Sequence, residues 1–273
     1  MLKKILKKLL GRFHKRYRTN YHNFPFGRTP RGSKDDYLRI WSESKEEVYP
    51  LIDNYEQKLQ SRINPEWLHE LALHTQVVIK SSRICYQHGR LLYTFVTDYL
   101  NRNDLNYINI LETGTARGFS CLCMAKALHD RDVEGKIITF DLLPHDVKMY
   151  WNCIDDLESP KSRKELLSNY SDLIERYVIF CEGDTRLMQE KIDMSRINFA
   201  FIDASHTFED VVSEFSYINE RQRQGDNILF DDYQPNYFPG VVKAVDTICD
   251  KYGYLLETIS VSDQRGYAIA YKV

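Results

Sequence analysis

From residue 107 onwards, short apolar runs alternate with longer amphipathic stretches, and this alternation limits the folds open to the chain. The apolar runs are 107–111, 137–140, 177–181, 197–202 and 227–230. The helical candidates between and after them are 117–130, 163–176, 207–223 and 239–252. Nearly continuous apolar strands that alternate with helices predict a parallel sheet covered on both faces. Residues 254–260 and 266–272 have no helix between them, so we expect an antiparallel pair at the sheet edge.

The first hundred residues form a different region. Apolar residues recur at helical spacing in 1–18, with lysines on the other face, which is typical of a helix lying on anionic lipid. The alternatives are a frayed basic arm and a helix docked on the body or on a second copy of the chain. Pro and Gly punctuate 19–45, which predicts an irregular linker, whereas 45–103 is predicted helical with a break at Asn64. The predicted domains are therefore a helix over 1–18, an extension over 19–104 and an α/β domain over 105–273.

Composition excludes several classes of protein. No run of 18 apolar residues exists, so no membrane span is expected. The first 20 residues hold eight Lys and Arg and no acid, so the remainder is acidic and is not predicted to bind nucleic acid. The six cysteines form no CxxC motif, which indicates a reduced, cytoplasmic protein without a zinc site. Any contact with the inner face of a membrane is expected only through residues 1–18.

A glycine loop follows the first predicted strand. The run Glu112-Thr113-Gly114-Thr115-Ala116-Arg117-Gly118-Phe119-Ser120 leads from strand to helix, which places bare backbone N–H groups at a helix N-terminus. The spacing is GxxxG, which matches neither the dinucleotide fingerprint nor the P-loop, and this disfavours a nicotinamide oxidoreductase.

Acids end the first three predicted strands. Glu112 opens the glycine loop, Asp141 ends the second strand, and Asp184 follows the third. The acid after the second strand of a doubly wound fold accepts hydrogen bonds from ribose hydroxyls. Together the three acids predict a crevice for a cationic nucleoside, although each alone would also serve as a helix N-cap.

These motifs, in this order, resemble those of class I S-adenosylmethionine-dependent methyltransferases over residues 107–273. The resemblance implies a Rossmann-like methyltransferase fold, with the methionine part of the cofactor on the glycine loop, its ribose on Asp141 and its adenine beside Asp184. The cofactor-binding residues predicted on this basis are Glu112, Gly114, Thr115, Gly118, Ser120, Asp141, Asp184 and Asp203.

Three further acids follow the fourth and fifth strands. Asp203 ends one run, and Asp231 and Asp232 end the next. Neighbouring parallel strands lie about 4.8 Å apart, so these carboxylates are expected to converge and to attract a divalent cation. An all-oxygen set favours Mg²⁺, Mn²⁺ or Ca²⁺ over zinc. The alternative for Asp231 and Asp232 is a turn that opens the next helix.

The pattern Ile-Asp-x-x-His followed by Asp-Asp-Tyr resembles the metal-dependent branch that methylates sugars and glycosylated natural products, the macrocin O-methyltransferase type. The resemblance implies Asp203, Asp231 and Asp232 as ligands of Mg²⁺ or Mn²⁺. Ser205 stands where such enzymes often carry a second Asp as base, so His206 is the predicted base, with Asp203 beside it in the catalytic set. The alternative for His206 is a capping or orienting role.

The predicted function is metal-assisted methyl transfer from S-adenosylmethionine to a hydroxyl of a sugar or glycosylated molecule. The insertion 142–162 is expected to close over the acceptor, with Tyr150 and Trp151 stacking on a sugar ring. The alternatives are a metal-independent enzyme, a catechol-type O-methyltransferase, or a non-catalytic cofactor-binding subunit tethered to a membrane-associated glycan-assembly complex.

Overall fold

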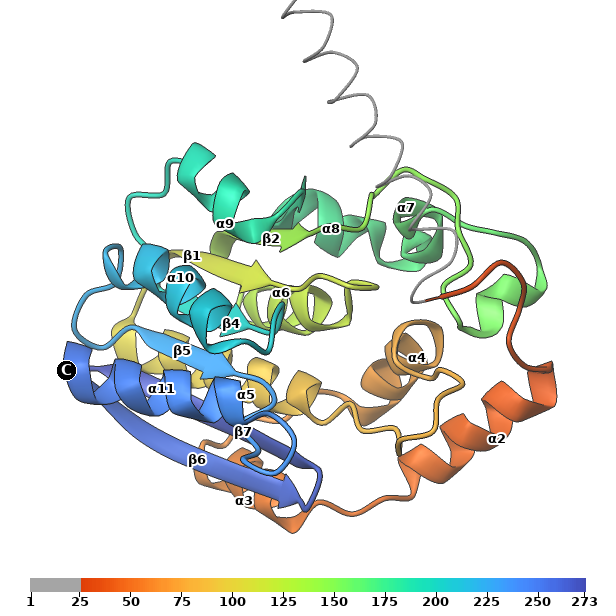
Figure 1. The fold of residues 1–273 in the computed structure, drawn as a ribbon, viewed down its shortest axis with the longest axis horizontal. Coiled ribbons are helices and arrows are strands. Elements are labelled where there is room, and N and C mark those ends of the chain that lie inside the picture. The colour runs from red at the N-terminus through yellow and green to blue at the C-terminus, as the bar shows by residue number, and fades with distance from the viewer. Residues whose placement is uncertain (1–25) are drawn as a thin grey trace, which may run out of the picture.

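A seven-stranded sheet forms the centre of the computed structural model, which describes residues 26–273 (Figure 1). The strand order is β3-β2-β1-β4-β5-β7-β6, and β1 to β5 pair in parallel. The strands are β1 Tyr107–Thr113, β2 Glu134–Asp141, β3 Val178–Glu182, β4 Phe199–Ile202, β5 Asn227–Phe230, β6 Tyr254–Ser262 and β7 Arg265–Lys272. The predicted doubly wound, mostly parallel sheet is confirmed.

The two faces of the sheet belong to two separate cores, as the apolar strands predict. In β4, Phe199 and Phe201 pack into one core, while Ala200 and Ile202 pack into the other. Successive side chains of a strand point to opposite faces, so a strand that is apolar throughout needs helices on both sides. The helices of this domain are α6 Phe119–Asp130, α7 Arg163–Leu166, α8 Ser171–Tyr177, α9 Thr185–Met188, α10 Phe208–Asn219 and α11 Pro239–Tyr252.

The last two strands form the predicted antiparallel pair at one edge of the sheet. β7 pairs antiparallel with both β5 and β6, so it lies between them and leaves β6 outermost. This placement brings the start of β7 beside the end of β5, where the acidic residues lie.

Within the described residues, four helices precede the sheet, and they pack against it, against α6 or against one another. They are α2 Lys34–Lys45, α3 Pro50–Lys58, α4 Pro65–Thr75 and α5 His88–Asn103. Asn64 caps α4 as predicted, because its side-chain oxygen accepts a hydrogen bond from the backbone N–H of Trp67 at 3.0 Å. The helical prediction for 45–103 was too long, since 76–87 are not helical and α3 begins only at Pro50.

The prediction that 19–45 is irregular was wrong for its second half, which forms α2. Ser33 and Asp36 make a capping box, in which each side chain accepts a hydrogen bond from the other residue's backbone N–H. Tyr37, Ile40 and Trp41 recur at helical spacing, and Tyr37 is buried. The Pro and Gly residues before Ser33 led to the prediction of a linker, although the Ser-x-x-Asp pattern indicates the start of a helix.

The single helix predicted over 163–176 is also divided. Ser162 caps the short α7, and a 3-10 turn, Ser168–Tyr170, separates it from α8. Leu167, at the break, is fully buried and its Cδ1 approaches the space beside Gly118. The helix is therefore interrupted at the point where this leucine is buried under the glycine loop. Two further 3-10 helices are Ile154–Leu157 and Gln189–Lys191.

The insertion over 142–162 does not present its tryptophan to a ligand. Trp151 is fully buried, its ring lies 5.5 Å from that of Phe26, and its indole N–H donates to the carbonyl of Lys161 at 2.7 Å. The expected stacking of Trp151 on a sugar is therefore wrong. His74 of α4 holds the insertion through a 2.7 Å contact between its Nδ1 and Asp155.

The predicted helix over 1–18 lies outside the described residues. Among the residues that the structure does describe, no helix is long and apolar enough to cross a membrane.

Removal of the Ser33 cap tests the account of α2. We expect Ser33→Ala to lower the free energy of unfolding by about 1 kcal/mol, because it frees one helix N–H that the hydroxyl satisfies. Ser42→Ala, at an exposed position of the same helix, is the control and should cause no loss. Urea unfolding followed by circular dichroism measures both, and equal stabilities of the two variants would contradict the capping role.

Candidate active site

The glycine loop leaves β1 in a backbone conformation that only certain residues tolerate. Gly114 and Gly118 both have φ of +91°, and Ala116 between them has φ of 45°. A Cβ on Gly114 would lie 2.2 Å from the carbonyl oxygen of Asp203. The loop therefore touches the backbone after β4, and this contact joins the two parts of the site.

Two charged side chains hold the strained Ala116 in place. Its N–H donates to Asp141 Oδ2 at 2.5 Å, and its carbonyl accepts from Arg163 Nε at 2.9 Å. Arg163 itself is buried, and its Nη2 lies 3.7 Å from Asp141. An alanine with positive φ needs such support from its surroundings. Asp141 thus fixes the loop at the same position where it was predicted to hold a ribose.

A cavity of about 420 Å³ opens beside this loop, within the usual size of small-molecule sites. Four of the eight residues predicted to bind the cofactor line it: Gly114, Asp141, Asp184 and Asp203. Asp184 also caps α9 and pairs with Arg186 at 3.1 Å, so its predicted capping alternative is present too.

The other four predicted cofactor residues, Glu112, Thr115, Gly118 and Ser120, do not line the cavity. Thr115 is buried against Thr139, and their hydroxyl groups are hydrogen-bonded. Glu112 accepts from the hydroxyl of Thr139, while its other oxygen is buried without a hydrogen bond. Burial raises the pKa of Glu112 to about 7. These buried side chains pack under the glycine loop and support it instead of facing the cavity.

Three residues of this cavity were not predicted. Arg186 of α9 pairs with Asp210 of α10 at 2.9 Å, and Glu214 lies one turn further along α10. Glu214 is only 2% exposed, and its carboxylate accepts a hydrogen bond from the hydroxyl of Thr113 at 2.8 Å. The i, i+4 spacing of Asp210 and Glu214 is the one sequence signal that places both on one helix face.

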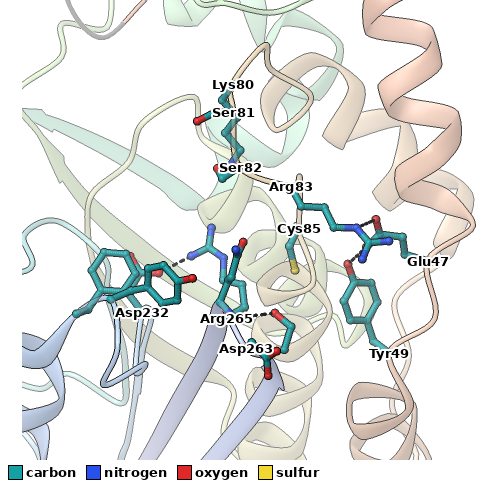
Figure 2. Close-up of a pocket in the computed structure, with 14 residues that line it drawn as sticks. Glu47, Tyr49, Lys80, Ser81, Ser82, Arg83, Cys85, Asp232, Asp263 and Arg265 are labelled. Carbon is teal, nitrogen blue, oxygen red and sulfur yellow. Dashed lines mark hydrogen bonds and ion pairs between the residues drawn. The ribbon is translucent and has the colours of Figure 1, made fainter.

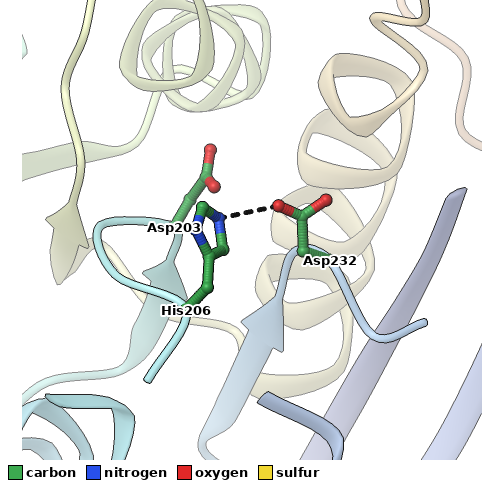
Figure 3. A group of neighbouring side chains, drawn as sticks. All are labelled: Asp203, His206 and Asp232. Carbon is green, nitrogen blue, oxygen red and sulfur yellow. Dashed lines mark ion pairs between the residues drawn. The ribbon is translucent and has the colours of Figure 1, made fainter. Parts of the chain in front are cut away.

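The acids after β4 and β5 converge with a histidine. Ligand atoms of Asp203, His206 and Asp232 all lie within 4.8 Å of one another (Figure 3). His206 Nε2 is 2.8 Å from Asp232 Oδ2, and its ring lies 4.7 Å from that of Phe238. Ser205, in contrast, donates to Asp210 at 2.6 Å. The predicted convergence of Asp203 with Asp232 is therefore present, and His206 stands beside both.

The third predicted ligand, Asp231, is not in this group. Its Oδ1 accepts from the backbone N–H of Asp232 at 2.7 Å and lies 3.5 Å from Arg265 Nη1. Arg265 approaches Asp232 more closely, with 2.5 Å between Nη1 and Oδ1. Asp232 has a positive φ of 54°, and its carboxylate, not that of Asp231, contacts His206. An arginine that partly neutralises the acids was not expected from the sequence.

The acids of the cluster destabilise one another's charged forms despite this arginine. Burial and the charges of Asp231 and Asp232 raise the pKa of Asp203. Burial raises the pKa of Asp231 to about 6 although Arg265 opposes the change. The hydrogen bond to Asp232 raises the pKa of His206. Three acids against one guanidinium favour a further cation, and two convergent carboxylates with an imidazole offer the oxygen and nitrogen donors that such an ion needs.

A second cavity, of about 880 Å³, has Asp232 in its wall (Figure 2). It is bounded by the segment between α4 and α5, by the residues before α11 and by the turn between β6 and β7. Its lining residues that matter here are Glu47, Tyr49, Lys80, Ser81, Ser82, Arg83, Asp232, Tyr237, Phe238, Asp263 and Arg265.

Comparison with known proteins adds to this geometry. Residues 111–233 match the model of a family described as a methyltransferase domain. No curated protein sequence matches the chain.

Solved structures with the same fold include several O-methyltransferases. NovP matches with a TM-score of 0.54 and 18% identity, covering 71% of this chain and 83% of that one. TomG from Streptomyces achromogenes, involved in tomaymycin synthesis and solved with S-adenosylmethionine, gives 0.52 and 16%, covering 78% and 92%. The Bacillus cereus O-methyltransferase in complex with S-adenosylhomocysteine gives 0.50 and 15%, covering 86% and 96%. At these identities the likeness is one of fold.

The contact between Gly114 and Asp203 predicts a large effect of one methyl group. Gly225 provides the matched control, because its φ of +89° is similar but an added Cβ would meet nothing closer than 4.0 Å. We expect Gly225→Ala to cost about 1 kcal/mol for its φ alone. Gly114→Ala should cost about 1–3 kcal/mol more, the usual size of overpacking. Urea unfolding of both variants checks this, and equal losses would contradict the close approach.

Proposed function

We propose that this chain, whose residues 111–233 match the model of a methyltransferase domain, is a class I S-adenosylmethionine-dependent enzyme. It methylates a hydroxyl oxygen of a sugar or glycosylated molecule with the help of a divalent cation. One observation carries the proposal. Asp203 lines the smaller cavity, Asp232 lines the larger one, and the two carboxylates belong to one cluster. The acidic cluster is therefore the partition between a cofactor-sized cavity and a larger cavity for an acceptor.

The smaller cavity has the features needed by S-adenosylmethionine, which supplies a methyl group on a positively charged sulfur. Its wall contains the carboxylates of Asp141 and Asp184, which can accept hydrogen bonds from ribose and base. Asp203 extends the acidic wall towards the partition, where a sulfonium group is favoured electrostatically. The structures of TomG and the Bacillus cereus enzyme contain this cofactor or its demethylated product in the same fold.

Asp203 and Asp232 are the proposed ligands of Mg²⁺ or Mn²⁺. A divalent cation bound here would lower the pKa of an acceptor hydroxyl and so make it a better nucleophile. The mutual repulsion of the acids fits such an ion, which would stabilise their charged forms. Asp232 contacts His206 through one oxygen and Arg265 through the other, so a cation bound here would compete with these partners for the carboxylate.

His206 is the proposed base. Its side chain is 49% exposed, so Nε2 can turn from Asp232 towards an acceptor in the larger cavity. The nearby negative charges of Asp231 and Asp232 stabilise the protonated imidazole even when Nε2 turns away, which favours proton uptake from a hydroxyl. Phe238 limits the motion of the ring on one face.

Aromatic residues in the larger cavity suit a sugar. Tyr237, 54% exposed, and Phe238 line it from the segment before α11, and Tyr49 lines it from the N-cap of α3. Such side chains offer an apolar face and, in tyrosine, a polar tip. We therefore assign to these residues the stacking on a sugar ring that was expected of Trp151, which is buried elsewhere.

Removal of divalent cations tests the metal role. We expect EDTA to abolish methyl transfer and Mg²⁺ or Mn²⁺ to restore it, because the acceptor hydroxyl otherwise keeps its high pKa. The assay measures methyl transfer from S-adenosylmethionine to a panel of sugars, glycosylated products and catechols. Full activity in chelator would contradict the proposal, and turnover confined to catechols would favour the catechol-type alternative.

Replacement of His206 tests the base. His206→Ala should slow methyl transfer by about 10²-fold or more, the usual size of a general-base effect. His129→Ala, at the exposed end of α6, is the control and should leave the rate unchanged. An unchanged rate in His206→Ala would show that His206 serves only to orient Asp232.

A further inference from the structure

The larger cavity contains three cations, and two of them already have acidic partners. Arg83 pairs with Glu47, whose other oxygen accepts from the hydroxyl of Tyr49. Arg265 pairs with Asp232 and Asp231 through Nη1. These pairs account for the charges of Glu47 and Asp232, so neither acid is left for the third cation.

The third cation, Lys80, has no hydrogen bond or ion pair with any residue in 26–273. Charged groups of both signs act on it: Arg265 and Arg117 lower its pKa, whereas Cys85 and Asp232 raise it. Loss of solvent lowers the pKa of Lys80, and next in size is the repulsion from Arg265. Two cations that repel each other in the wall of a cavity are both stabilised by an anion that binds between them.

Lys80 opens a bend that supplies further donors. Ser81 and Ser82 follow it, both line the cavity, and both are exposed in a bend between α4 and α5. Within the described part of the chain, neither hydroxyl is engaged in a hydrogen bond. Hydroxyl and ammonium donors on one short segment are suited to the several oxygens of an oxyanion.

We propose that the acceptor is an anionic sugar, whose phosphate or carboxylate group is bound by Lys80 and the Ser81–Ser82 bend, opposite Arg265. This inference rests on the proposed function, because it assigns the class of acceptor at that same site. The anionic group lies away from the methylated hydroxyl, which faces Asp203, Asp232 and His206. Binding of the anion at Lys80 then orients the sugar with that hydroxyl towards the partition between the cavities.

One acid in the cavity forms no ion pair with any residue in 26–273 and limits where the anion can lie. Asp263 is exposed in the turn between β6 and β7, and no ion pair joins it to Lys80. Like charges repel, so the anion is expected on the Lys80 side of the cavity and away from this turn.

Calorimetric titration tests the inference with three sugars of similar size. Protein saturated with S-adenosylhomocysteine is titrated with glucose 6-phosphate, glucuronate and neutral glucose. We expect at least one of the two anionic sugars to bind at least about tenfold more tightly than glucose, and the stronger of the two identifies phosphate or carboxylate as the group recognised. Lys80→Gln should remove at least about tenfold of that affinity, the range of a charge-assisted hydrogen bond.

Lys136→Gln is the matched control, since it removes the same charge from an exposed position on β2 outside the cavity. It should leave sugar affinity unchanged. Equal affinities for anionic and neutral sugars, no binding of either anionic sugar, or an equal loss in both lysine variants would overturn the anionic acceptor. Failure to bind S-adenosylhomocysteine in the first place would instead contradict the proposed function, and the two failures are thereby distinguished.

Discussion

The register of β1, β4 and β5 is the constraint on which the site depends. Thr113 lies opposite Ile202, and Ile202 lies opposite Phe230, so the three strands end at the same level. Backbone hydrogen bonds continue this alignment by one residue, from Asp203 to Thr113 at 3.0 Å and from Asp231 to Ile202 at 3.1 Å. The glycine loop and both sets of acids therefore meet at one edge, because parallel strands bring their carboxyl ends together.

The alignment of the strands has an electrostatic consequence, because it brings the carboxylates of the acidic cluster close together. Three buried or partly buried carboxylates repel one another, and a single guanidinium from β7 offsets only part of that repulsion. A divalent cation would bring more charge to the same point and would compete with Arg265 for Asp232. On the proposed function, Arg265 then turns its charge towards the larger cavity, whose wall also contains Lys80. One arginine thus couples the proposed metal site to the proposed recognition of the acceptor.

Local patterns predicted much of this molecule, and long-range contacts account for most of what they missed. The apolar strands, the glycine loop and the final antiparallel pair follow from periodicity and from the conformational range of glycine, which are local properties. The helix at Lys34–Lys45 also had a local signal, the capping box at Ser33, which the neighbouring glycines and prolines concealed. Arg265 had none, because its position depends on the insertion of β7 between β5 and β6. The different contacts of Asp231 and Asp232 depend on the positions of His206 and Arg265, which the sequence does not specify.

Diffraction from crystals grown with Mn²⁺ and S-adenosylhomocysteine tests the central claim most directly, since manganese scatters anomalously. The account predicts a manganese peak within coordination distance of Asp203 and Asp232, with Arg265 turned away and the nucleoside beside Gly114. A nucleoside bound there with no manganese at the cluster, and Arg265 still paired with Asp232, would contradict it.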